Sequence, residues 1–300
     1  MNAKKSVPRR IFLTCNIIYL IIVSLICVLP FINLLAISFS DRVPVMAGKV
    51  RFWPIGFNTA AYAFILRNSA FTNAVMVSVQ RTLLGVAINV LLIILTAYPL
   101  SKSKEAFRGR GVFSWFFIIT ILFSGGLIPS YMMVRNTGLL DKIWALVLPG
   151  AVPVFSVLVV MNYMRSLPKE LEEAAYVDGA SHIQTLLRVI LPVSAPTIAT
   201  VTLFAFVGHW NSWFDGMLYM NRVENYPLQT YLRTVIINPE QFFRNAAAFT
   251  TTDIERYLNI INARTSSAAQ LFLATVPILC VYPFLQKYFT TGLVLGSVKG

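Results

Sequence analysis

Residues 172–196 read EEAAYVDGASHIQTLLRVILPVSAP, a polar and acidic stretch between two long apolar segments. Across the 300 residues, 57% are hydrophobic and only 12% are charged, which leaves too little polar surface to cover a soluble globular protein. We therefore expect a chain embedded in a lipid bilayer. A charged segment that interrupts such a chain is expected to lie in water and to present a docking surface to another protein.

Six apolar segments have about the length of a bilayer span, for which roughly 20 apolar residues are needed. They predict an all-α polytopic membrane protein with transmembrane helices near residues 11–38, 73–99, 112–134, 143–164, 197–220 and 267–289. Gly125, Gly126 and Pro129 indicate a bend or a close helix approach within the third span. The three cysteines all fall inside apolar segments and predict neither a disulfide framework nor a metal site.

Basic residues near the first spans indicate the orientation of the chain. They form two clusters, Lys4, Lys5, Arg9 and Arg10 in the N-terminal arm and Lys102, Lys104, Arg108 and Arg110 in the short connection 101–111. Because short cytoplasmic loops carry an excess of Lys and Arg, both clusters are expected to be cytoplasmic. With six spans, both termini and residues 165–196 then lie inside, and 221–266 forms an external loop. One transmembrane domain accounts for residues 1–300.

The polar stretch has the local signals of two short helices joined by a turn. Ser166 is a candidate N-cap, and Glu170, Glu172 and Glu173 place negative charge near the positive end of a first helix. Gly179 can adopt a turn conformation that other residues resist.

Ser181 and Gln184 have capping-box spacing, which predicts the start of a second helix. The small side chains of Ala174, Ala175 and Ala180 would allow another protein to approach the backbone closely. Glu173 and Asp178 could accept charge-assisted hydrogen bonds from that protein.

The motifs Glu173-Ala174-Ala175, Asp178-Gly179-Ala180 and Ile190-Leu191-Pro192 match the EAA signature of permease subunits of bacterial ABC importers. From the first span to Gly300 the chain resembles the MalG-like, carbohydrate-uptake branch of this binding-protein-dependent family, with its type I importer fold. In that family the EAA helix docks into a cytoplasmic ATPase and transmits its motion. The resemblance therefore implies a coupling role for Glu173, Ala174, Ala175, Asp178, Gly179, Ala180 and Ser181.

The same resemblance implies a set of partners in a bacterial inner membrane. It implies a second permease subunit, two ABC ATPase subunits at the cytoplasmic face, an extracytoplasmic solute-binding protein that meets the external loop 221–266, an oligosaccharide and surrounding lipid, with no nucleic acid. A homodimeric pore and a plainly solvated external loop stay open as alternatives.

The motifs that the sequence lacks indicate which functions belong to other subunits. The chain lacks a G-x-x-x-x-G-K-[ST] phosphate loop, so ATP and Mg²⁺ are expected on the partner ATPases and no cofactor is expected on this chain. It also lacks a catalytic motif that would predict an enzyme. An ion-driven secondary transporter or an intramembrane enzyme would be the competing classes.

A polar and aromatic cluster, GHWNSWFD at residues 208–215, lies in the outer half of the fifth predicted span. Such residues are costly against lipid and should face the bundle or a water-filled cavity. Asn211 and Asp215 could hydrogen-bond a sugar, while Trp210 or Trp213 packs against its ring. An interfacial aromatic belt with interhelical hydrogen bonds explains the cluster equally well.

Arg81 is a charged residue within the second predicted span, where it costs on the order of 3 kcal/mol. Its charge could be compensated by Asp215, by an anionic substrate or partner, or by extension of the side chain to the membrane interface. His182 and His209 are expected to be hydrogen-bonding or packing residues rather than metal ligands.

Three stretches of the sequence indicate the class of saccharide that is expected as substrate. They are GLIPSYMMVRNTGLL at 126–140, GHWNSWFDGMLYM at 208–220 and YPLQTYLR at 226–233. They resemble permeases that import oligosaccharides from complex polysaccharides, including pectin-derived and alginate oligosaccharides. The net charge of +13 and Arg81 would favour an acidic saccharide, although basic cytoplasmic loops explain much of that charge, and a neutral one stays open.

Overall fold

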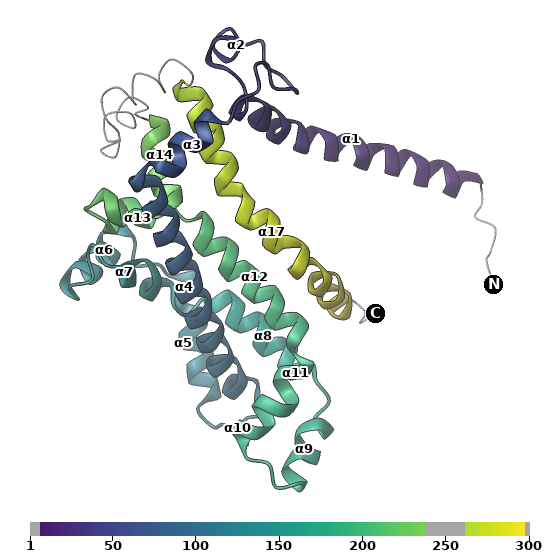
Figure 1. Ribbon diagram of the computed structural model, residues 1–300. Helices are drawn as coiled ribbons and strands as arrows, with labels where there is room; N and C mark the ends of the chain where they lie inside the picture. Colours follow the sequence, from purple (N-terminus) through teal and green to yellow (C-terminus); the bar gives the residue numbers. More distant parts are fainter. Residues whose placement is uncertain (1–6, 238–261, 298–300) are drawn as a thin grey trace. The chain divides into compact units, whose positions relative to one another are not determined.

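The computed structural model describes residues 7–237 and 262–297 (Figure 1). In these ranges the chain is helical and forms no strand, which confirms the all-α expectation. The α-helices are α1 (Val7–Ser38), α2 (Arg42–Met46), α3 (Ala60–Arg67), α4 (Ser69–Ser101), α5 (Arg110–Leu122), α6 (Leu127–Asn136), α7 (Ile143–Val147), α8 (Val154–Ser166), α9 (Glu170–Val177), α10 (His182–Thr185), α11 (Leu191–Val193), α12 (Ala195–Asn211), α13 (Phe214–Tyr219), α14 (Leu228–Ile237) and α17 (Ala263–Ser297).

Three described helices are individually long and apolar enough to cross a membrane: Pro8–Ser38, Ser69–Ser101 and Ala263–Pro283. Three further candidates are pairs of helices bent at a short break. The bends are 115° between α5 and α6, 46° between α7 and α8, and 82° between the helices on either side of Ser194. The described part of the chain therefore has up to six spans, if each bent pair crosses the membrane once.

The third predicted span is broken at its glycines. α5 ends at Leu122, and Gly126 has a φ of +86°, in the left-handed region that a residue without Cβ adopts readily. The bend expected at this pair of glycines is thus confirmed.

The fourth and fifth predicted spans are less continuous than expected. Residues 143–164 include a 3₁₀ turn at Leu148–Gly150 between α7 and α8. The helix expected over 197–220 ends at Asn211, and Asp215 lies on the separate helix α13. Hydropathy could not reveal the break at Leu148–Gly150 because the residues on both sides of it are apolar.

The described residues form two compact units, one of 7–72 with 234–237 and 262–276 and the other of 73–233 with 277–297. In the first unit, apolar side chains of α1 are exposed over most of its length, as expected for a helix that faces lipid. The amide of Asn33 on α1 donates a hydrogen bond to the carbonyl of Arg51, with an N–O distance of 2.6 Å. This bond attaches the loop after α2 to α1.

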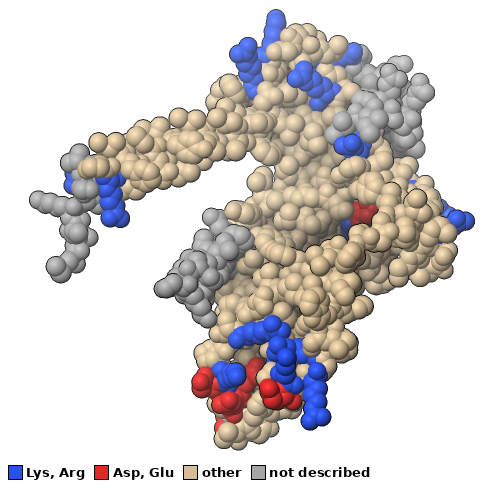
Figure 2. All heavy atoms as spheres, turned by 180° about the vertical axis from the view of Figure 1, so that it is seen from behind, with Lys and Arg blue, Asp and Glu red and all other residues tan. Residues whose placement is uncertain are grey.

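In the second unit, α4 runs between an end that carries α9 and α10 and an end that carries α6, α7 and α13 (Figure 1). Side chains of α4, α8 and α12 form its main core, including Ile93, Ala97, Leu100, Val157, Val160 and Val201. Charged side chains of both signs gather at the α9 and α10 end, whereas the neighbouring body is mostly uncharged (Figure 2). This distribution is consistent with one polar end outside the hydrocarbon region.

At the opposite end of this unit, Asp141 connects the α6–α7 loop to the chain after α13. Its φ is +60°, and its amide donates to the Tyr219 carbonyl at 2.9 Å. Its carboxylate accepts from the amides of Asn221 and Arg222 at 3.1 and 3.3 Å. Burial raises the pKa of Asp141, but hydrogen bonds from Asn225, Arg222 and Asn221 outweigh it and hold the pKa below its usual value.

We expect Asp141→Ala to lower the free energy of unfolding by about 1–2 kcal/mol, because the hydrogen-bonded carboxylate is lost. The depressed pKa means that this contribution is complete above the unfolded pKa and declines only as the pH falls through the folded value. The measurement is the apparent melting temperature in detergent at pH 7. Arg222→Ala is the control, since that side chain is 75% exposed and its ion pair should contribute little. Equal effects of both changes would contradict the prediction.

Candidate functional site

The segment after α8 forms the predicted helix–turn–helix, and its turn explains the Asp178-Gly179-Ala180 motif. Gly179 has a φ of +79° directly after the last turn of α9. The Ala180 amide donates to the Ala175 carbonyl at 2.9 Å, and the Gly179 amide donates to the Tyr176 carbonyl at 3.0 Å. This pair of bonds is the Schellman arrangement, which satisfies the last carbonyls of a helix and requires a left-handed residue.

The start of α10 is also as predicted. The Gln184 amide donates to the Ser181 hydroxyl, and the Ser181 amide donates to the Gln184 side chain at 2.8 Å, which completes the capping box. A π-helical turn, Leu186–Ile190, then leads toward α11. The prediction for Ser166 is wrong: it belongs to α8, its hydroxyl donates to the Tyr163 carbonyl, and Lys169 occupies the N-cap position of α9.

The structure divides the predicted coupling residues into an outward and an inward group. Glu173, Ala174, Asp178, Gly179 and Ser181 are exposed, and Ala180 is half-buried. Ala175 is buried within its own chain.

Two apolar residues at the same turn went unrecognised in the sequence. Val177 and Ile183 are 87% and 69% exposed. Both lie in the segment that carries the exposed acidic residues Glu173 and Asp178. The sequence positions of Val177 and Ile183 could have revealed their exposure, because neither residue lies on the buried face of its short helix.

The inward face of α9 and α10 is attached to α4 and the residue that follows it. Lys102 Nζ lies 2.6 Å from Glu172 Oε2, and the Tyr98 hydroxyl donates to the His182 carbonyl at 3.2 Å. The Tyr176 hydroxyl lies 2.8 Å from His182 Nδ1. Burial and hydrogen bonding with Tyr98 raise the pKa of Tyr176, so its hydroxyl stays protonated and can donate to this nitrogen.

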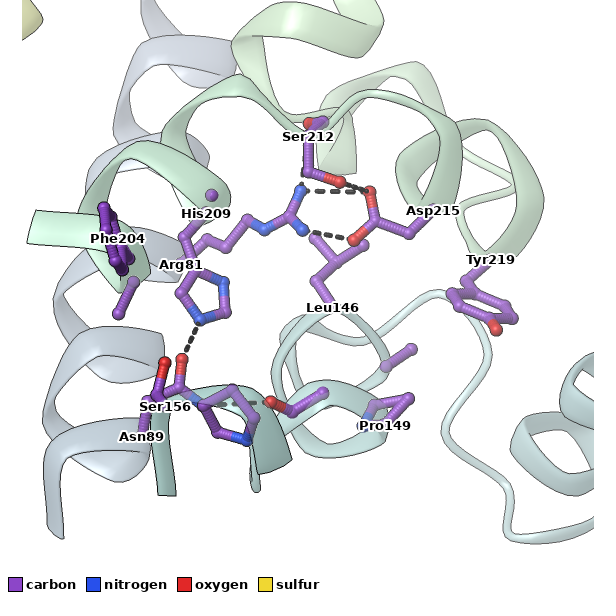
Figure 3. A pocket seen from close by; sticks show the side chains of 15 residues that line it. Arg81, Asn89, Leu146, Pro149, Ser156, Phe204, His209, Ser212, Asp215 and Tyr219 are labelled. Carbon is purple, nitrogen blue, oxygen red and sulfur yellow. Dashed lines mark hydrogen bonds and ion pairs between the residues drawn. The ribbon is translucent and has the colours of Figure 1, made fainter. Parts of the chain in front are cut away.

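A second candidate site is a cavity of about 510 Å³ between α4, α7, α8, α12 and α13. Figure 3 shows Arg81, Ser212 and Asp215 on one side of it and Asn89, Ser156 and Pro149 on the other. Its lining residues are Arg81, Asn89, Ala145, Leu146, Pro149, Gly150, Pro153, Ser156, Phe204, Ala205, Gly208, His209, Ser212, Asp215 and Tyr219.

Arg81 is paired with Asp215, the first of the three compensations considered from the sequence. Both terminal nitrogens of the guanidinium contact the carboxylate, and Nη1 also donates to the Ser212 carbonyl at 3.1 Å. Asp215 Oδ1 further accepts from the Ser212 hydroxyl at 2.8 Å and from the Gly216 amide at 2.9 Å. The carboxylate is therefore fully engaged inside the chain, and the charge of Arg81 is neutralised there.

Asn89 and His209 form a second polar contact across the cavity. The Asn89 amide nitrogen donates to the carbonyls of Gly150 and Ala151 at 3.0 and 2.8 Å, so its oxygen faces His209 Nε2 at 2.8 Å. That arrangement assigns the proton to Nε2. The His209 ring lies against Gly85, where an added Cβ would come within 2.3 Å of it.

Of the predicted pathway residues, only Arg81 and Asp215 line the cavity. Trp210 is buried with its ring stacked on Phe206 at 6.4 Å, and the Trp213 ring lies 4.5 Å below the Arg233 guanidinium. Asn211 is exposed outside the lining.

The sequence interpretation missed Asn89, whereas the hydrogen-bonding role that it predicted for His209 is confirmed. A usable signal was present, since Arg81, Gly85 and Asn89 recur every four residues and so share one face of a transmembrane helix.

Comparison with known proteins extends these observations. LplC of Bacillus subtilis (strain 168) is 38% identical over 292 residues, which cover 97% of this chain and 96% of LplC. The polygalacturonan/rhamnogalacturonan transport system permease protein YtcP of the same organism is 36% identical over 282 residues, covering 94% and 96%. The backbone is similar to a chain in the crystal structure of a bacterial ABC transporter involved in the import of the acidic polysaccharide alginate. The TM-score is 0.86 and the identity 30%, over 96% of this chain and all of that one.

The family model for binding-protein-dependent transport system inner membrane components matches residues 3–294. This match covers nearly the whole chain, including the helix–Gly–helix segment and every residue of the cavity. The chain therefore belongs to the family of binding-protein-dependent transport system inner membrane components, as a carbohydrate permease of an ABC importer.

Proposed function

We propose that this chain forms one half of an alternating-access pore for a polysaccharide-derived oligosaccharide, driven by separate ATPase subunits. The observation that carries the proposal is the orientation of the helix–Gly–helix segment. Glu173 and Asp178 face outward, while Glu172 and His182 of the same segment contact Lys102 and Tyr98. The inner face of this segment is bound to the rest of the chain, and its outer face is acidic. Such an arrangement suits mechanical coupling to a partner protein.

In this proposal, the partner subunits hydrolyse ATP. ATP and Mg²⁺ would be bound by two ABC ATPase subunits that dock on Glu173, Ala174, Asp178, Gly179, Ala180 and Ser181. Exposed Val177 and Ile183 would add apolar contact area at that surface. The present chain is then a non-catalytic subunit, with a second permease as the other half of the pore.

The cavity beside Arg81 is the candidate stretch of the sugar pathway. Its volume of about 510 Å³ lies within the roughly 300–1,000 Å³ of small-molecule sites. Phe204 offers a ring face for the C–H groups of a sugar, and His209 offers a polar edge. Arg81 and Asp215 contribute a neutral pair rather than a free charge.

The proposed substrate class is supported by the names of related proteins and not by the charge of Arg81. Because Asp215 compensates the guanidinium, the electrostatic reason for an acidic substrate no longer applies to this residue. Relatives named for polygalacturonan/rhamnogalacturonan transport and for import of the acidic polysaccharide alginate favour an acidic oligosaccharide over a neutral one.

The expected setting is a bacterial inner membrane with both termini and the helix–Gly–helix segment in the cytoplasm. The solute-binding protein would then meet the opposite side of the membrane, including the external loop 221–266. That loop is described only up to residue 237 and from residue 262.

The test is purification of the native complex through a tag on this chain, followed by reconstitution in lipid vesicles. We expect a second permease and ATPase subunits to copurify, and ATP hydrolysis to rise when a saccharide-loaded binding protein is added. Uronate oligosaccharides should stimulate more strongly than their carboxyl-reduced counterparts of equal length. Uptake by the isolated chain on an ion gradient without ATP would contradict the proposal.

A further inference from the structure

One uninterrupted helix connects the two candidate sites. α4 extends over 33 residues from Ser69 to Ser101, or about 50 Å at 1.5 Å per residue. Arg81 and Asn89 line the cavity, whereas Tyr98 near its end and Lys102 just after it contact the helix–Gly–helix segment. Pro99 lies in the last turn of α4, after Tyr98, and the stretch from Arg81 to Tyr98 contains no proline and no break. We therefore expect this stretch to move as one element.

Near the cavity, side chains of α4 bind main-chain groups at the ends of other helices. The Ser78 hydroxyl accepts from the Leu228 amide at 2.7 Å, at the start of α14. Arg81 donates to the Ser212 carbonyl, where α12 ends, and Asn89 donates to the carbonyls of Gly150 and Ala151 before α8.

These contacts determine how the broken helices are held. Main-chain groups freed by a break cost several kcal/mol if they stay unpaired in a bilayer. The cavity walls are therefore bound to α4 at the positions where their own helical hydrogen bonds stop. A displacement of α4 would displace both helix ends that border the cavity.

The cytoplasmic end of α4 has a corresponding set of contacts. Lys102 Nζ lies 2.6 Å from Glu172 Oε2 and 3.9 Å from the centre of the Tyr98 ring. The side chains of Lys102 and Glu172 are only 12% and 25% exposed. Tyr98 in turn donates to the His182 carbonyl on α10.

We infer that Lys102 and Glu172 are positioning residues that transmit movement of the ATPase-docked segment to α4, and through α4 to the cavity walls. The inference rests on the proposed function and adds a route for the motion. Glu172 differs in role from its neighbour Glu173, because Glu172 faces its own chain and Glu173 faces outward.

The test measures saccharide taken up per ATP hydrolysed by the complete complex in vesicles. Lys102→Met and Glu172→Gln should each lower this ratio roughly three- to tenfold, the size expected for loss of one partly buried, charge-assisted hydrogen bond. Stimulated ATP hydrolysis should continue, because the outward docking surface is unchanged. A merely structural role would instead reduce the amount of assembled complex and leave the ratio of uptake to hydrolysis constant.

Two further variants sharpen the result. The exchanged pair Lys102→Glu with Glu172→Lys should restore the ratio to within about twofold of the wild type, since the ion pair is re-formed in reverse. Lys104→Met removes an exposed neighbouring charge and should leave the ratio unchanged. Wild-type ratios in both single variants, or no recovery in the exchanged pair, would overturn the inference. Absence of saccharide-stimulated hydrolysis in the wild type would instead contradict the proposed function.

Discussion

Arg81→Met is expected to destabilise the folded permease by about 3–5 kcal/mol, because the carboxylate of Asp215 would remain in a low-dielectric site without its counter-charge. Asp215→Leu should be similarly harmful, since the side chain of Arg81 is only 3% exposed. The double variant should lose clearly less than the sum of the two, because neither charge is then left uncompensated. The measurements are the yield of folded protein and its apparent melting temperature in detergent.

Arg233→Met is the matched control for this double-mutant cycle. Its guanidinium lies 4.5 Å from the Trp213 ring, close to the same helix break, but its side chain is exposed. Loss of this cation–π contact should cost only about 0.5–1 kcal/mol. Strictly additive losses for Arg81 and Asp215 would show that the ion pair does not carry the stability of this region.

Gly179→Val is expected to abolish coupled transport, because a β-branched residue is strongly disfavoured at a φ of +79°. The strain of about 1–2 kcal/mol would disrupt the hydrogen bonds that end α9 and would shift the capping box of Ser181. The outward surface formed by Glu173 and Asp178 would then no longer match a partner. Uptake and copurification of the ATPase subunits measure this effect.

Gly179→Asn provides the control, because Asn tolerates the left-handed region better than other residues with a side chain. An added Cβ meets no atom within 4 Å at this position, so the backbone angle rather than crowding decides the outcome. We expect the Asn variant to keep most of the uptake. Equal loss in both variants would indicate that the partner contacts the glycine itself.

The local structure of the helix–Gly–helix segment was predictable because its signals lie within a few residues. The spacing of Ser181 and Gln184 defines a capping box, and Gly179 follows a short helix at the position where a left-handed residue ends it. The direction in which each side chain points was not predictable. Ala174 and Ala175 are identical neighbours, yet only Ala175 is buried.

The intramembrane site was predictable only in part. A charge within an apolar span requires compensation, and that argument correctly identified Asp215 as a partner for Arg81. The aromatic residues were assigned to the pathway by chemistry alone, and the structure places Trp210 and Trp213 outside the cavity lining. Their spacing along the chain is uninformative because α12 ends between them.

By itself, the sequence determined that this protein is a helical membrane permease with an acidic helix–Gly–helix turn, since composition, hydropathy and short motifs are local properties. Only the tertiary structure decided where the spans break and which polar groups meet. The residues concerned are distant along the chain: 134 positions separate Arg81 from Asp215, 120 separate Asn89 from His209, and 70 separate Lys102 from Glu172. Such contacts depend on how helices pack in three dimensions, and the periodicity within any one helix does not encode its neighbours.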